Sequence, residues 1–128
     1  MDRSVLHRRI FLAGGIWNLA MGIPIALLVP WLPALIHIDD PRYPIFIYFN
    51  LMTVTMFGFV ALTVARNLAT MRSMMLILVW SKILTAGVFV GAWLWLPMPR
   101  ELTEFLAPGM AVDLGLGIAY WWVWRSRA

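Results

Sequence analysis

The sequence contains no cysteine and only two histidines, His7 and His37, in 128 residues. The absence of cysteine excludes disulfides and thiol chemistry. The two histidines precede and follow the first apolar run, on opposite sides of the membrane topology derived below, so they cannot serve as the two axial ligands of one haem. His37 with Asp39 and Asp40 is the one arrangement that offers cation ligands, and a solvated turn explains the same residues. We therefore predict no metal site and no cofactor.

Patterns typical of enzymes and of nucleic-acid-binding proteins are also missing. The sequence has no Ser/His/Asp triad, no glycine-rich phosphate loop and no paired carboxylates placed for catalysis. A basic patch with interleaved aromatic residues, which is the usual signature of nucleic-acid binding, is absent. The sequence therefore predicts a protein that is not an enzyme and that does not bind nucleic acid.

Charged residues are scarce, while long apolar runs dominate the chain. Hydrophobic residues make up 62% of the sequence and charged residues 12%, and the mean hydropathy is +0.83. Soluble domains carry about 25% charged residues. Four apolar runs, at about 10–29, 44–65, 73–96 and 103–124, are each close to the ~20 residues that a membrane-spanning helix needs. None alternates with the period of two that a barrel strand requires. We predict a single all-α integral membrane domain over 1–128, a four-helix up-down antiparallel bundle.

The arginines predict the orientation. Seven lie in the N-terminal tail, the connection between the second and third runs, and the C-terminus: Arg3, Arg8, Arg9, Arg66, Arg72, Arg125 and Arg127. The two remaining connections contain only Arg42 and Arg100, beside four carboxylates. This asymmetry predicts that both termini are cytoplasmic, because cytoplasmic loops are enriched in Lys and Arg. We expect Arg8, Arg9, Arg66, Arg72, Arg125 and Arg127 to face anionic lipid headgroups, although an acidic partner surface would also suit some of them.

Lys82 and Asp113 are the only charges well inside the apolar runs. At 1.5 Å per residue, Asn18 lies about 12–14 Å from the cytoplasmic boundary, Lys82 about 15 Å and Asp113 about 16 Å. All three therefore belong to one polar layer near the middle of the membrane, where an unpaired charge is costly. We predict a buried ion pair, with Asn18 and either Ser81 or Thr85 completing its hydrogen bonds. The pair either fixes the register of the helices or forms a proton-responsive or ligand-binding site.

Glycines flank the polar layer at intervals of four residues. Gly14 and Gly22 lie one turn on either side of Asn18, and Gly109 and Gly117 flank Asp113 in the same way. Such small residues let the backbones of membrane helices approach closely. Gly87 and Gly91 form a further GxxxG pair, about half a helix circumference from Lys82. This pair suits either ordinary bundle packing or contact with a partner.

Three short motifs resemble the DoxX-like group of small bacterial four-helix membrane proteins. They are AGGIWNL at 13–19, SKIL at 81–84 and DLGLG at 113–117. The resemblance implies a bacterial inner-membrane protein of the accessory-subunit kind and implies little chemistry. Our leading hypothesis is a non-enzymatic accessory or scaffold subunit that packs against a larger membrane complex or in a homo-oligomer. The alternative is a small oligomeric transporter or channel that uses Lys82 and Asp113 for proton or ligand coupling.

Overall fold

The computed structural model describes residues 3–42 and 44–126, and the regular structure in these ranges is entirely helical. Its elements are four long helices and one short one: α1 (Arg3–Leu28), α2 (Leu32–Leu35), α3 (Pro44–Arg66), α4 (Arg72–Trp95) and α5 (Arg100–Ser126). The four long helices are long and apolar enough to cross a membrane. The prediction of an all-helical chain with four potential membrane spans is therefore confirmed.

Two of the long helices begin well before the predicted apolar runs. α1 begins at Arg3 instead of residue 10, and α5 begins at Arg100 instead of residue 103. An apolar run marks the membrane-crossing part of a helix, whereas the helix itself continues wherever its backbone bonds and side chains allow. In α5 the early start is accompanied by an Arg100 Nε–Glu104 Oε1 contact of 2.6 Å, at the i,i+4 spacing that stabilises helices.

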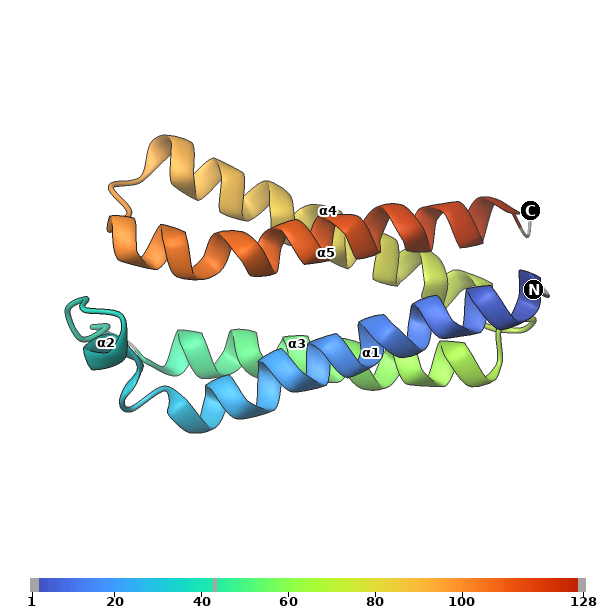
Figure 1. Ribbon diagram of the computed structural model, residues 1–128, viewed down its shortest axis with the longest axis horizontal. Coiled ribbons are helices and arrows are strands. Elements are labelled where there is room, and N and C mark those ends of the chain that lie inside the picture. Colours follow the sequence, from blue (N-terminus) through green and yellow to red (C-terminus); the bar gives the residue numbers. More distant parts are fainter. Residues whose placement is uncertain (1–2, 43, 127–128) are drawn as a thin grey trace.

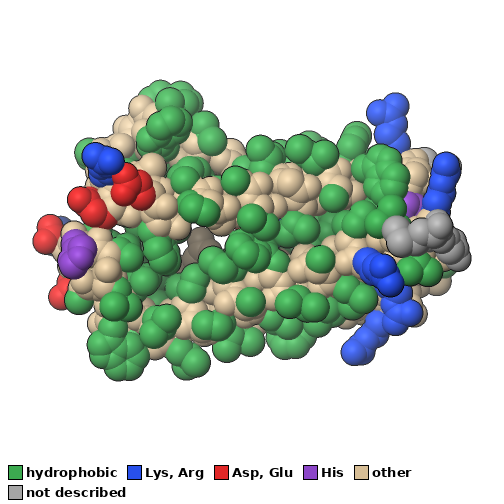
Figure 2. Space-filling view, viewed as in Figure 1, with side chains coloured by type: hydrophobic (Ala, Val, Ile, Leu, Met, Phe, Trp, Pro, Cys, Tyr) green, Lys and Arg blue, Asp and Glu red, His purple; other side chains and the backbone are tan. Residues whose placement is uncertain are grey.

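The helices form two pairs, α1 with α3 and α4 with α5, and these pairs lie against each other (Figure 1). Both chain ends lie at the same end of the molecule as the connection between α3 and α4, and α2 lies at the opposite end (Figure 1). The charges separate in the same way (Figure 2). We call the end with Arg8, Arg9, Arg66, Arg72 and Arg125 the basic end, and the end with Asp39, Asp40, Glu101 and Glu104 the acidic end.

Two glycines bring α1 and α3 into close contact. A Cβ atom at Gly15 would lie 3.1 Å from the carbonyl oxygen of Gly58, and one at Gly58 would lie 3.2 Å from that of Gly15. Side chains larger than hydrogen would therefore push the two backbones apart. Gly22 makes a similar approach to α3, because its Cβ would meet the Thr55 hydroxyl.

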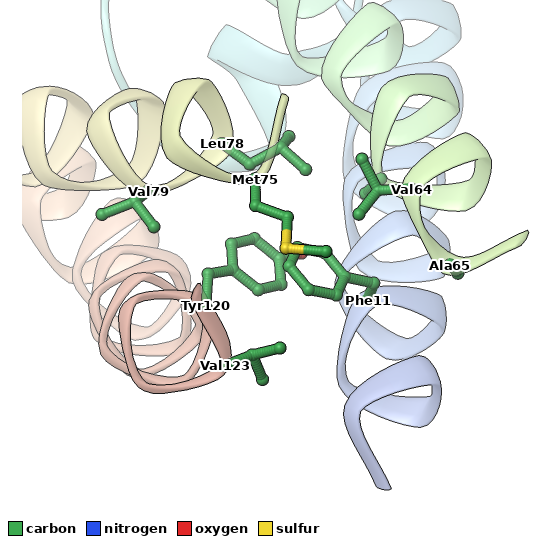
Figure 3. Close-up of a cluster of buried hydrophobic side chains, with 9 residues drawn as sticks. Phe11, Val64, Ala65, Met75, Leu78, Val79, Tyr120 and Val123 are labelled. Atoms are coloured by element: carbon green, nitrogen blue, oxygen red, sulfur yellow. The ribbon is translucent and has the colours of Figure 1, made fainter. Parts of the chain in front are cut away.

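The hydrophobic core occupies only one half of the bundle. Its buried side chains are Phe11, Ala61, Val64, Ala65, Met75, Leu78, Val79, Tyr120 and Val123. All of them lie between the predicted polar layer and the basic end. The Phe11 and Tyr120 rings stack with centroids 4.5 Å apart, and Met75 lies beside them (Figure 3). Among the described residues, Val29 and Pro33 are the apolar side chains buried outside this region. The two helix pairs are therefore held together mainly near the basic end.

Candidate functional site

Lys82 joins three helices in a buried polar layer. Its Nζ atom donates to Asp113 Oδ1 on α5 at 2.6 Å and to Asn18 Oδ1 on α1 at 2.5 Å. Lys82, Asp113 and Asn18 are 4%, 8% and 2% exposed. The structure thus brings together the three residues that depth counting placed at one level.

Trp17 is a fourth member of this layer that sequence reasoning missed. Its indole Nε1 donates to Asp113 Oδ1 at 3.1 Å, so one carboxylate oxygen accepts bonds from both α1 and α4. The sequence did contain one signal for this role, which is the depth of Trp17 in its apolar run. Trp17 neighbours Asn18 near the middle of its apolar run, whereas tryptophans that anchor membrane proteins lie at the headgroup level.

Ser81 and Thr85 do not take the role expected of them. Ser81 Oγ donates to the Leu78 carbonyl at 2.8 Å, and Thr85 Oγ1 donates to the Ser81 carbonyl at 2.7 Å. Hydroxyls on helices often bond to carbonyls one turn earlier, and this local partner is always within reach. The Trp17 indole instead supplies the second donor to Asp113.

Three of the predicted packing glycines make tight helix contacts. A Cβ atom at Gly117 would lie 3.0 Å from Lys82 Cβ, so this glycine lets α4 approach α5 one turn from Asp113. A Cβ atom at Gly14 would collide with the Tyr120 hydroxyl, and Gly22 approaches Thr55 as described above. Gly117 therefore allows the close α4–α5 approach beside the Lys82–Asp113 contact, while Gly14 and Gly22 bring α1 close to α5 and α3.

The remaining glycines of the predicted set are not tightly packed. Gly109 has only the Met21 Cε atom within reach, at 4.0 Å from a Cβ position. Gly91 meets Trp95 of its own helix at 3.4 Å, and at Gly87 no described atom lies within 4 Å. The interpretation of Gly87 and Gly91 as ordinary bundle packing within this chain is therefore wrong. Their face of α4 is uncovered.

Tyr120 carries a buried hydroxyl beside this layer. The residue is fully buried, and its Oη atom is the only buried side-chain polar atom among the described residues that has no hydrogen-bond partner. Tyr120 follows Asp113 by two helical turns and therefore lies on the same face of α5. Its ring packs in the core while its hydroxyl presses against the backbone of Gly14.

The arginines at the basic end occupy different surroundings. Arg8 and Arg9 are exposed on α1, and Arg66 and Arg125 lie in the last turns of α3 and α5, where a positive charge complements the helix dipole. Arg72 places its Cζ atom 5.2 Å from the centroid of the Trp124 ring, a cation–π contact between α4 and α5. Arg127, predicted to face headgroups with them, lies outside the described residues.

The arrangement neutralises one positive and one negative charge within a buried cluster. In residues 3–42 and 44–126, no group of three or more acidic or histidine side chains is placed to hold a metal ion.

Comparisons with known proteins add no identity to this geometry: no family model, no curated protein and no solved structure matches the chain. The site must therefore be interpreted from its own chemistry.

Proposed function

We propose that this chain is a non-enzymatic accessory or scaffold subunit that packs in the bilayer against other membrane polypeptides. The observation that carries the proposal is the closed polar layer. Lys82 and Asp113 contact each other at 2.6 Å, and Asn18 and Trp17 add one hydrogen bond each. The intramembrane charges are thus engaged in joining α1, α4 and α5.

The uncovered face of α4 supports the same proposal. Gly87 has open space around its Cα, and the neighbouring Val88 side chain is 72% exposed. Exposed apolar side chains are expected wherever lipid surrounds a helix, so exposure alone does not identify a partner. A GxxxG pair that no other helix of this chain covers, however, lets a second helix approach more closely than lipid chains require. We propose Gly87 and Gly91 as the centre of the contact with a partner subunit.

The proposal includes a location and an orientation. The segregation of arginines at the basic end supports both termini on the cytoplasmic side of a bacterial inner membrane, with the four long helices in up-down order. Membership of the DoxX-like group also remains a proposal, supported by the three short motifs in α1, α4 and α5.

The test is to isolate the chain at native expression level in native nanodiscs and to identify its companions by native mass spectrometry. Stoichiometric recovery of one or more other membrane polypeptides is expected. Gly87→Leu should abolish this recovery without changing the helix content, because the new side chain occupies space that is open in the isolated chain. Gly115→Leu is the matched control, because no described atom lies within 4 Å of that position either. Recovery of a bare monomer would overturn the proposal.

The alternative is a small oligomeric transporter or channel, and one observation favours it. The core lies entirely between the polar layer and the basic end, so the layer is less thickly covered toward the acidic end. In that case a homo-oligomer should be isolated, and Asp113→Asn should remove proton-coupled flux from reconstituted vesicles while the protein stays folded. An accessory subunit would show no such flux in the first place.

A further inference from the structure

A groove on the surface of α4 and α5 begins one helical turn from Asp113. It is lined by Trp80 and Ile83 of α4 and by Gly117, Ile118 and Trp121 of α5. Its volume of about 340 Å³ falls in the range of small-molecule sites. Gly117, which lines the groove, also packs close to Lys82, because a Cβ atom at Gly117 would lie 3.0 Å from Lys82 Cβ. The groove thus lies close to the residue that forms the ion pair with Asp113.

Toward the basic end, the part of α5 that lines the groove leads to Arg125. On α5, Trp121 follows Gly117 by four residues and Arg125 follows Trp121 by four, so all three lie on one stripe of the helix. Arg125 is exposed and lies in the last turn of α5. At 1.5 Å per residue, Arg125 is about 12 Å from Gly117 along the axis. This distance is close to the depth of one hydrocarbon leaflet, which is about half of ~30 Å.

This combination has the chemistry of a phospholipid. An apolar groove accommodates part of an acyl chain, and an exposed arginine about one turn beyond Trp121 is placed to meet a phosphate through charge-assisted hydrogen bonds. Trp121 lies between these two levels, where an indole suits the ester region of a lipid. Arg72 stacks on Trp124, whose ring centroid lies 5.2 Å from that of Trp121, and so adds positive charge beside this end of the groove.

We propose that this groove binds one anionic phospholipid, with an acyl chain over Gly117 and its phosphate at Arg125. The proposal is independent of the accessory-subunit role. In this proposal, lipid covers the part of the α4–α5 surface between the polar layer and the basic end. The Gly87–Gly91 part of α4 lies further toward the acidic end and remains accessible for a protein contact.

The test is native mass spectrometry of the full chain, released from nanodiscs that contain equal amounts of phosphatidylglycerol and phosphatidylcholine with identical acyl chains. One phosphatidylglycerol should be retained in preference to phosphatidylcholine. Arg125→Gln should lower its retention about fivefold, the effect of losing roughly one cationic contact at a membrane surface. Arg66→Gln is the matched control, because Arg66 lies at the same end on α3, away from the groove. It should leave retention unchanged.

A second variant tests the acyl-chain part of the groove. Ile118 is 63% exposed, so Ile118→Trp should fill the groove without disturbing the fold and should lower retention of both lipids. Equal retention of the two lipids by the unmodified protein would overturn the proposal, as would equal effects of Arg125→Gln and Arg66→Gln. Because the chain has no cysteine, the thiol introduced by Ile118→Cys is the only one available, and any disulfide cross-link must form at the groove. Efficient disulfide cross-linking between two copies in the membrane would show that protein covers the groove, and would also overturn the proposal.

Discussion

Lys82 Nζ and Asp113 Oδ1 lie 2.6 Å apart in a site where both side chains are almost completely buried. Opposite charges that leave water together lose hydration free energy, which their mutual attraction and added hydrogen bonds must offset. Asn18 and Trp17 supply those hydrogen bonds here. The four residues therefore act energetically as one unit, and replacing one member affects the others.

The first prediction concerns this unit. Asp113→Leu should destabilise the bundle by about 3–5 kcal/mol, because it leaves the Lys82 ammonium buried without an anion. The double variant Lys82→Met/Asp113→Leu should be more stable than either single variant, since no uncompensated charge remains. Reversible unfolding in mixed micelles measures both effects. Additive losses in the double variant would show that the two charges are not coupled.

An exposed ion pair provides the contrast. Arg100 and Glu104 make a contact of the same length, 2.6 Å, but their side chains are 86% and 60% exposed. Glu104→Gln should therefore change the free energy of unfolding by less than about 0.5 kcal/mol. A large loss in the same micelle assay would mean that this helix end is buried against something in the assembled protein.

Trp17→Phe should weaken the polar layer. The variant keeps an aromatic ring but removes the indole donor to Asp113, and hydrogen bonds to charged groups contribute about 1.5–3 kcal/mol. Trp95→Phe is the matched control, because Trp95 is 79% exposed, and it should have little effect. Equal stability of the two variants would show that the Trp17–Asp113 bond contributes nothing.

The close contact between Gly14 and Tyr120 predicts that even a small side chain at position 14 is destabilising. Gly14→Ala should destabilise the bundle by about 1–3 kcal/mol, the usual range for overpacking, because the new Cβ collides with the Tyr120 ring and hydroxyl. Gly14→Ala/Tyr120→Leu should recover part of that loss relative to Tyr120→Leu alone. Gly87→Ala, in open space, should instead stabilise the isolated helix by up to about 1 kcal/mol through helix propensity. Thermal unfolding of the four variants distinguishes these outcomes.

Leu78 and Leu94 test the position of the core. Both belong to α4, but Leu78 is fully buried while Leu94 is 60% exposed. Leu78→Ala should cost about 2–5 kcal/mol, as in other cores, and Leu94→Ala should cost far less. Similar losses at the two positions would show that the acidic half is also packed in the assembled state.

The sequence was sufficient to predict the level of the polar layer but insufficient to predict the faces of the helices. Lys82 and Asp113 were paired correctly because each has a defined depth and each is the only charge well inside its run. The Gly15–Gly58 approach and the Trp17 bond depend on rotation about the helix axis. A helix that is apolar on all sides contains little information about rotation, because lipid and core accept the same side chains. The location of the core near the basic end depends on the same missing information.

Because the core lies near the basic end, the two helix pairs are held together at that end and much less at the acidic end. The helix pairs are joined firmly near the basic end. Toward the acidic end, Met21 beside Gly109 is a loose contact between the pairs. We therefore expect the spacing of the two helix pairs there to depend on the thickness and lateral pressure of the surrounding bilayer or on a neighbour between them. The distance between spin labels placed on the two helix pairs at the acidic end should change with the thickness of the lipid bilayer. The same distance measured at the basic end should stay constant.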